Sequence, residues 1–275
     1  MKPLLALAGA LLLAGAAHAA ERLVLGVHDP ICKQTACSCV GDLAIREYGG
    51  LLAHVRRAAG IELEFKYYEE PLLLQREVVA GRLDGMVTKA WLGLCYARQA
   101  GRAFTRLADV TLPKGEPQEL YGLFIVPKES PLKQLADLQG KRLVLGMTNA
   151  YEKSYLAEET LRVARLEVKK SAVFKCQNAA VELVEQRADA AVISSYALHY
   201  GCINVVADPK EFRVIGETKR RIPFITFMVA DKVAPAVRER LQQALLALKG
   251  DQVPADLLSA GLIPPIAWAP EELGR

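Results

Sequence analysis

Short apolar runs and segments of helical periodicity alternate along the first hundred residues of the chain. Residues 23–27 have the composition of a buried strand, and apolar positions then recur at helical spacing up to a stop at Gly60. The expected order is strand 23–27, helix 42–59, strand 61–67, helix 71–80, strand 84–87 and helix 91–100. Such alternation predicts parallel sheets covered by helices, an α/β fold.

The same plan repeats after the middle of the chain. The expected order there is strand 141–147, helix 154–163, strand 167–173, helix 178–186 and strand 189–193. Residues 78–87 and 184–192 correspond closely, because each is a helix end and a turn, followed by an aspartate that opens an apolar strand. The repetition predicts two similar lobes.

Two extended apolar segments, 120–126 and 222–229, are expected to cross between the lobes. Residues 20–118 and 223–275 would then form lobe 1, and residues 119–222 would form lobe 2. Two crossing strands make a hinge, so we expect a ligand cleft between the lobes that closes around its ligand.

The amino terminus has the layout of a secretory signal peptide over residues 1–19. A positive start at Lys2 precedes an apolar run from Leu4 to Ala17, and Ala17-His18-Ala19 is a small-x-small cleavage pattern. The run is shorter than the ~20 apolar residues that a membrane span needs. We therefore expect the mature chain, about 255 residues, to begin near Ala20 or Glu21 and to be exported.

The charge of the chain is mild. Removal of Lys2 with the signal lowers the formal charge from +4 to +3, and aromatic residues make up only 7% of the sequence. The basic surface that a nucleic-acid-binding protein requires is missing, so no nucleic-acid partner is expected.

Ligand-binding loops of open parallel sheets follow the carboxyl ends of the strands. Here they cover residues 28–41, 88–96, 148–154, 174–178 and 194–196, and several of them open helices whose N-termini favour an anion. Hydroxyl, amide and ammonium groups in these loops would add hydrogen-bond donors. The candidates are Lys89, Tyr96, Thr148, Asn149, Tyr151, Lys175, Ser194 and Tyr196, and His28 ends the first strand beside them.

Six cysteines offer two interpretations. Thiols in three of these loops, Cys37, Cys39, Cys95 and Cys176, would suit a thiophilic ligand. In an oxidising compartment the same residues could instead form disulfides, Cys37 or Cys39 with Cys32 or Cys95, and Cys176 with Cys202. Spacing alone does not choose among the pairings, and it identifies no metal and no cofactor.

Several motifs resemble those of the periplasmic phosphate, phosphite and phosphonate-binding proteins of ABC transporters. Residues 121–146 are similar to the crossover segment of that family, and Trp91-Leu-Gly-Leu-Cys-Tyr96 resembles its Leu-Gly-Pro-x-x-Tyr loop. Gln177-Asn-Ala-Ala-Val181 stands where the family has His-Asp-Ala-Ala, and Ser194-Ser-Tyr-Ala-Leu198 where it has Asp-Ser-Tyr-Ala-Leu. The resemblance covers nearly the whole mature chain and implies a periplasmic, two-lobed type II binding fold without catalysis.

The departures from the family pattern bear on the ligand. The hydroxyl-rich run that grips a phosphonate corresponds here to Thr148-Asn149-Ala150, and the His-Asp pair corresponds to Gln177-Asn178. Relatives of this family sense arsenic oxyanions, and trivalent arsenic bonds to thiols. The resemblance and the cysteines together favour an arsenic oxyanion, especially arsenite, slightly over phosphate, phosphite or phosphonate, with Cys95 as the first thiol and Cys37, Cys39 or Cys176 as its partner.

The expected protein is a monomeric periplasmic binding protein, not an enzyme. Its partners would be a small oxyanion and either an ABC permease or the periplasmic domain of a sensor histidine kinase. Two alternatives remain open at this point. The same cysteines could serve a carrier of copper or another soft metal, or an exported thiol redox enzyme, although no Cys-x-x-Cys motif is present.

Overall fold

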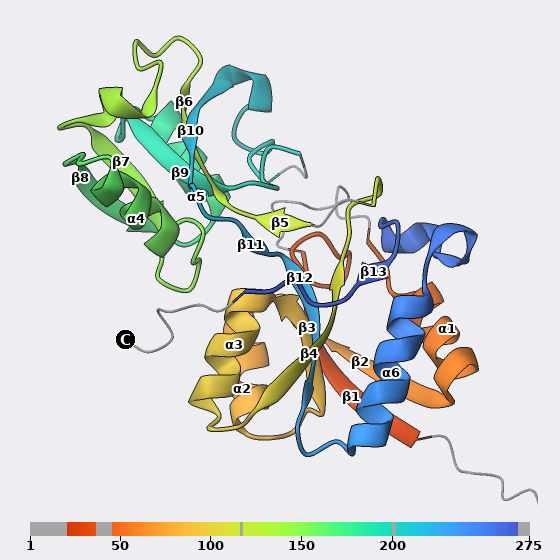
Figure 1. Ribbon diagram of the computed structural model, residues 1–275. Helices are drawn as coiled ribbons and strands as arrows, with labels where there is room; N and C mark the ends of the chain where they lie inside the picture. Colours follow the sequence, from red (N-terminus) through yellow and green to blue (C-terminus); the bar gives the residue numbers. More distant parts are fainter. Residues whose placement is uncertain (1–20, 37–45, 116–117, 200–201, 269–275) are drawn as a thin grey trace, which may run out of the picture.

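The computed structural model describes residues 21–36, 46–115, 118–199 and 202–268, which fold into two lobes (Figure 1). The expected signal peptide over 1–19 lies outside these ranges. None of the helices in the described ranges combines the length and the apolar character that a membrane crossing requires.

Lobe 1 is built on a six-stranded sheet with the order β13-β4-β12-β3-β1-β2. β1 pairs in parallel with both β2 and β3, whereas β12 is antiparallel to β3 and β4. Helices α1 and α6 contact each other on one face of the sheet, and α2 and α3 contact each other on the opposite face (Figure 1). The elements are β1 (Glu21–His28), α1 (Gly49–Ala59), β2 (Ile61–Tyr67), α2 (Pro71–Val79), β3 (Gly85–Lys89), α3 (Ala90–Gln99), β4 (Phe104–Val110), β12 (Ile225–Ala230), α6 (Pro235–Ala247) and β13 (Leu262–Ile263).

Lobe 2 repeats this plan on a five-stranded sheet with the order β10-β6-β9-β7-β8. Its order β9-β7-β8 corresponds to β3-β1-β2 in lobe 1, and in both cases the central strand is parallel to its two neighbours. The internal repeat expected from residues 78–87 and 184–192 is therefore present. The elements are β6 (Gly122–Pro127), β7 (Arg142–Gly146), α4 (Tyr155–Val163), β8 (Lys169–Val173), α5 (Cys176–Val184), β9 (Ala190–Ser194) and β10 (Phe212–Glu217).

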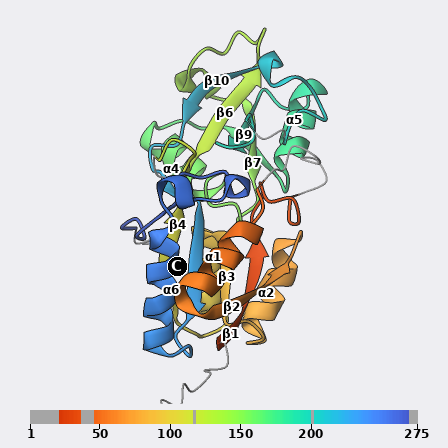
Figure 2. The ribbon, with the colours of Figure 1, turned by 90° about the vertical axis from the view of Figure 1, so that its right-hand side faces the viewer.

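The chain crosses between the lobes in a two-stranded antiparallel ribbon. β5 (Glu119–Leu120) leads into lobe 2 and β11 (Ile222–Pro223) leads back, with Leu120 opposite Ile222. Figure 2 shows the lobes stacked end to end, so that the carboxyl ends of the parallel strands of both lobes face the space between them. The two-lobed α/β fold with a two-strand hinge is confirmed.

One predicted helix is shorter than expected. The helix expected over 42–59 is found at Gly49–Ala59, whereas residues 42–45 lie outside the described ranges. It ends at Gly60, whose φ of 66° is the left-handed conformation that glycine adopts without strain. Residues 46–48 do not join it, because Arg46 exchanges backbone hydrogen bonds with Ile31 and Lys33 instead. That pairing fixes the loop that follows β1.

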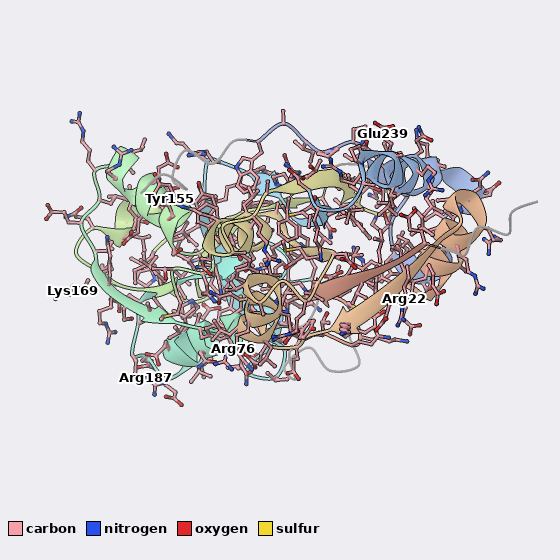
Figure 3. All side chains as sticks on the ribbon, turned by 90° about the horizontal axis from the view of Figure 1, so that it is seen from below. Arg22, Arg76, Tyr155, Lys169, Arg187 and Glu239 are labelled. Atoms are coloured by element: carbon pink, nitrogen blue, oxygen red, sulfur yellow. The ribbon has the colours of Figure 1, made fainter. Side chains whose placement is uncertain are left out.

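The hydrophobic core of lobe 1 extends across the interface between the lobes. Tyr151 and Leu156 belong to lobe 2, yet they are buried in the same cluster as the side chains around β1 and α6. Charged side chains such as Arg22, Arg187 and Glu239 project from the outer surfaces instead (Figure 3). The lobes are therefore packed against each other in a closed arrangement.

Candidate ligand-binding cleft

A cavity of about 110 Å3 lies where the two lobes meet. It collects residues from the carboxyl ends of strands in both sheets, which is where open α/β sheets bind ligands. The volume admits several waters or a ligand of a few non-hydrogen atoms. The lining residues are His28, Pro30, Thr35, Glu69, Glu70, Pro71, Lys89, Leu92, Asn149, Ala150, Lys153, Phe174, Lys175, Cys176, Tyr196 and Cys202.

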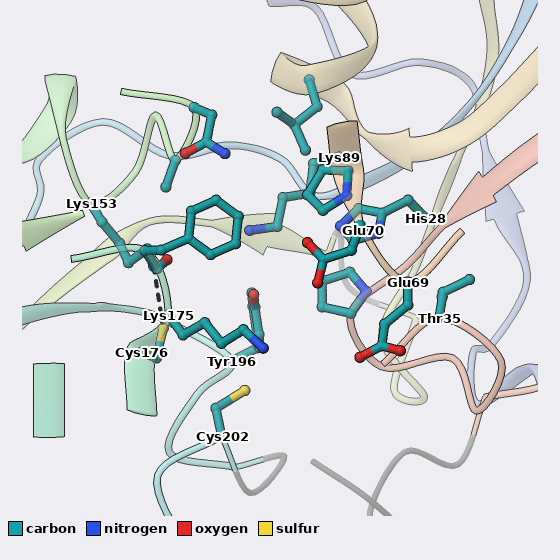
Figure 4. A pocket seen from close by; sticks show the side chains of 16 residues that line it. His28, Thr35, Glu69, Glu70, Lys89, Lys153, Lys175, Cys176, Tyr196 and Cys202 are labelled. Carbon is teal, nitrogen blue, oxygen red and sulfur yellow. Dashed lines mark hydrogen bonds between the residues drawn. The ribbon is translucent and has the colours of Figure 1, made fainter. Parts of the chain in front are cut away.

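The wall from lobe 1 carries one imidazole, one ammonium and two carboxylates. His28 and Lys89 are the last residues of β1 and β3, and Glu69 and Glu70 follow β2 (Figure 4). Nδ1 of His28 lies 3.0 Å from the carbonyl oxygen of Tyr68, and burial lowers the pKa of the imidazole. His28 is therefore neutral at pH 7.

The wall from lobe 2 carries two ammonium groups and two thiols. Cys176 is the first residue of α5, and Lys153 reaches it from the loop between β7 and α4 (Figure 4). The Lys153 ammonium donates to Sγ of Cys176 at 3.6 Å and to the carbonyl oxygen of Phe174 at 3.3 Å. A cation and a helix N-terminus together favour electron-rich atoms beside Cys176.

A buried ion pair joins the two walls behind the cavity. Lys89 Nζ lies 3.0 Å from Oε1 of Glu152, whose side chain is only 1% exposed. Ser194 also donates to that oxygen at 2.6 Å, and the thiol of Cys176 lies 3.7 Å from the Ser194 hydroxyl. Burial alone would raise the pKa of Glu152, but Lys89, Lys153 and the Ser194 hydroxyl outweigh it and lower that pKa. Glu152 is therefore ionised at neutral pH.

A glycine lets Glu152 approach this position. Gly122 begins β6, and a Cβ atom there would lie 2.4 Å from the backbone carbonyl oxygen of Glu152. The hydroxyl oxygen of Thr218 accepts a hydrogen bond from the amide of Gly122 at 3.0 Å, which holds the start of β6 in place. A larger residue at 122 would push the Glu152 loop away from Lys89.

Aromatic side chains pack beside the ion pair. Trp91 of α3 stacks on Tyr151 of lobe 2, with ring centroids 4.0 Å apart, and Tyr151 stacks in turn on Tyr155 at 5.3 Å. Tyr196 of lobe 2 stacks on Phe224 of lobe 1 at 5.0 Å, and the ammonium group of Lys89 lies 5.1 Å from the centroid of the Tyr196 ring. The Trp91–Tyr151 and Tyr196–Phe224 contacts span the two lobes beside the Lys89–Glu152 pair.

The structure contains free thiols at Cys32, Cys95, Cys176 and Cys202. The disulfide considered between Cys176 and Cys202 is therefore not formed, and both sulfur atoms border the cavity. Burial, reinforced by the neighbouring Cys176, raises the pKa of Cys202 to about 12. Cys202 is thus a protonated thiol at neutral pH.

The cavity brings together five of the residues singled out from the sequence, namely Lys89, Asn149, Lys175, Cys176 and Tyr196. His28 lines it as well. Cys37 and Cys39 lie outside the described residues.

Five other candidates lie elsewhere in the described structure. Cys95 packs at the edge of a lobe 1 core cluster, and Tyr96 donates from its hydroxyl to the carbonyl of Pro71 at 3.1 Å. Thr148 is exposed and borders a separate hollow on lobe 2. Tyr151 is buried in the aromatic stack, and Ser194 is buried against Glu152.

Sequence reasoning did not single out Glu69, Glu70, Glu152, Lys153 and Cys202 as ligand-site residues. The first two follow the carboxyl end of β2, so the rule that selected the other loops also applies to this one. Glu152 and Lys153 stand in a loop that was selected, but nothing in the local pattern separates them from an exposed charged pair. Cys202 lies eight positions beyond β9 and reaches the cavity only through the fold.

A family model described as "ABC transporter, phosphonate, periplasmic substrate-binding protein" matches residues 42–264. Curated protein sequences give no match.

Solved structures with the same fold are distant in sequence. They include a binding protein component of an ABC phosphonate transporter from Pseudomonas aeruginosa (12% identity, 89% of this chain and 81% of that chain, TM-score 0.64). PhnD1 from Prochlorococcus marinus in complex with methylphosphonate has 15% identity over 89% and 92% of the two chains, with a TM-score of 0.63. The aliphatic sulphonate binding protein SsuA from Escherichia coli has 15% identity over 82% and 70%, with a TM-score of 0.58. At these identities the likeness shows the fold alone.

Proposed function

This chain belongs to the family of periplasmic substrate-binding proteins of phosphonate ABC transporters, and from that premise we propose that it captures a small oxyanion between its lobes. Members of this family bind a substrate for a membrane permease and are not enzymes. The observation that carries the proposal is the cavity between the lobes, which lies at the carboxyl ends of the strands and is lined by three lysines and two cysteines.

We propose further that an arsenic oxyanion, arsenite above all, is favoured over phosphate, phosphite and phosphonate. Arsenous acid is uncharged at neutral pH and condenses with two thiols, so that two As–S bonds replace two As–O bonds. Each thiol proton leaves with a hydroxyl as water. Among the described residues, the cavity is lined by Cys176, which the sequence already offered as a partner thiol, and by Cys202, which takes the place of Cys95. Because this condensation starts from protonated thiols, the raised pKa of Cys202 does not oppose it.

The soft-metal alternative has less support. A metal cation binds thiolates, so a thiol with a pKa of about 12 must lose its proton at a cost before it can coordinate a metal. Within the described ranges, no group of three or more histidine, cysteine, aspartate or glutamate side chains is arranged to hold a metal. A thiol redox enzyme disagrees with the non-enzymatic family.

Thermal unfolding of the reduced mature protein tests the proposal. At about 100 times its dissociation constant a ligand stabilises the folded state by ~2.7 kcal/mol, a rise of roughly 5–10 °C in Tm for a chain of this size. We expect that rise with arsenite, and its loss in Cys176→Ala and in Cys202→Ala. The matched control is Cys95→Ala, which removes a half-buried thiol away from the cavity and should keep the rise.

An equal rise with phosphate, methylphosphonate and arsenite, unchanged in Cys176→Ala and Cys202→Ala, would contradict the thiol-based ligand. It would leave the protein as a general oxyanion-binding component.

The ligand-bound, closed protein also needs a membrane partner. We propose the permease of an ABC transporter, which the family favours, ahead of the periplasmic domain of a sensor kinase. Deletion of the gene should then reduce ligand accumulation by cells. Unchanged accumulation, together with loss of ligand-induced transcription, would favour the sensor kinase instead.

A further inference from the structure

Glu152 accepts hydrogen bonds from two groups that could otherwise donate to an anionic ligand. The Lys89 ammonium and the Ser194 hydroxyl both point at one of its carboxylate oxygens, at 3.0 Å and 2.6 Å. Glu152 itself does not line the cavity, but Lys89 does, and so does Cys176 beside Ser194. The carboxylate therefore stands directly behind the wall of the ligand site.

The charges of the described residues around the cavity balance when Glu152 is included. The lining contributes the ammonium groups of Lys89, Lys153 and Lys175 and the carboxylates of Glu69 and Glu70, a net charge of +1. The third carboxylate, Glu152, reduces that sum to zero. His28 adds no charge, because burial lowers its pKa.

We propose that Glu152 is a fixed internal counter-ion that sets the charge of the ligand. With Lys89 already neutralised, the cleft accepts an uncharged or singly charged oxyacid and discriminates against a dianion. Because the Glu152 carboxylate is buried, its Coulomb repulsion with a ligand anion is much stronger than in bulk solvent. One extra negative charge on the ligand should therefore lower its affinity strongly. This inference rests on the proposed function, since it specifies the ligand class of the same cleft.

Two methyl compounds of nearly equal shape separate charge from size. Methanesulfonate carries one negative charge, and methylphosphonate carries two at about pH 9. Isothermal titration calorimetry at that pH should show the wild-type protein binding methanesulfonate at least tenfold more tightly, which corresponds to about 1.4 kcal/mol. Tighter binding of methylphosphonate by the wild type would overturn the inference, and this measurement needs no variant.

A second test replaces the Glu152 carboxylate by its neutral isostere. Glu152→Gln keeps an oxygen that can accept from Ser194, and it should raise the affinity for methylphosphonate at least tenfold over the wild type. The matched control Glu158→Gln removes one negative charge from an exposed pair with Lys170 and should leave the affinity unchanged. No gain in Glu152→Gln, or an equal gain in both variants, would overturn the inference.

The two proposals fail separately. If arsenite does not bind while Glu152→Gln gains methylphosphonate binding, the proposed ligand is wrong and the counter-ion assignment stands. If arsenite binds through Cys176 and Cys202 while Glu152→Gln gains nothing, the proposed ligand stands and the assignment of Glu152 is wrong.

Discussion

The ammonium nitrogen of Lys89 lies 3.0 Å from a carboxylate oxygen of Glu152, and the two residues belong to opposite lobes. Lys89 ends β3 of lobe 1, whereas Glu152 stands in the loop between β7 and α4 of lobe 2. Trp91 follows Lys89 by two positions and stacks on Tyr151, which directly precedes Glu152. The closed arrangement therefore combines a buried ion pair with a stacked aromatic pair, both made by the same two segments of the chain.

Loss of one partner of this pair should destabilise the protein strongly. Lys89→Met leaves the carboxylate of Glu152 buried and uncompensated, which costs about 3–5 kcal/mol of unfolding free energy. Urea denaturation followed by circular dichroism measures the loss. Lys170→Met breaks the exposed pair with Glu158 and should cost at most ~1 kcal/mol. Similar small losses in both variants would show that the buried pair contributes no more than a surface pair.

Glu152 should also make the stability depend on pH in the acid range. Its pKa in the folded protein lies below the ordinary value of 4.5, so its ionised form stabilises the fold at higher pH. That contribution is fully present above about pH 4.5 and is lost as the pH falls through the folded-state pKa. The difference in unfolding free energy between wild type and Glu152→Gln should be constant from about pH 6 to 8 and should shrink below about pH 4.5. A difference that grows on acidification would contradict this assignment.

A second buried ion pair fixes the loop after β1. Nη1 of Arg46 donates to Oδ2 of Asp29 at 2.8 Å, and the Tyr48 hydroxyl donates to the same oxygen at 2.7 Å. Asp29→Asn leaves the buried guanidinium uncompensated and should lower the unfolding free energy by about 3–5 kcal/mol. Tyr48→Phe removes one hydrogen bond only, so a loss of about 1–3 kcal/mol is expected. Thermal unfolding of both variants measures these losses. Equal losses of unfolding free energy in Asp29→Asn and Tyr48→Phe would contradict the assignment of a buried ion pair.

Two thiols should react slowly with alkylating agents. Burial raises the pKa of Cys95 to about 11, and burial with the neighbouring Cys176 raises that of Cys202 to about 12. Because the thiolate is the nucleophile, iodoacetamide at neutral pH should modify both at least tenfold more slowly than free cysteine. Peptide mass spectrometry reads each site separately, and both rates should rise as the pH increases. Rapid labelling of Cys202 at neutral pH would show that its thiol is not held in the protonated form.

Much of the fold could be predicted from the sequence, because the signals are local. Apolar periodicity reflects which face of each segment is buried, and it indicated the strands at 61–67 and 141–147 and the helix that ends before Gly60. The expectation that residues 46–48 belong to that helix was wrong, since the backbone pairing of Arg46 with Ile31 and Lys33 competes with helix formation and periodicity carries no sign of it.

The loops that carry the cleft were also accessible from the sequence. The carboxyl ends of the parallel strands directed attention to Lys89, Asn149, Lys175 and Cys176, and the structure brings all four to one cavity. That rule works because a parallel strand order alone places these loops on one edge of a sheet.

The order of the elements, the internal repeat and the positions of the thiols and ammonium groups along the chain follow from the amino-acid sequence alone. Which of these groups come into contact depends on the tertiary packing. Lys89 and Glu152 are 63 positions apart, and their contact depends on how one lobe is rotated onto the other. Packing within lobe 1 placed Cys95 against a core cluster of that lobe, and the fold of lobe 2 brought Cys202 to the cleft. Local patterns report burial within a segment, whereas a site between lobes is set by long-range packing that no local pattern encodes.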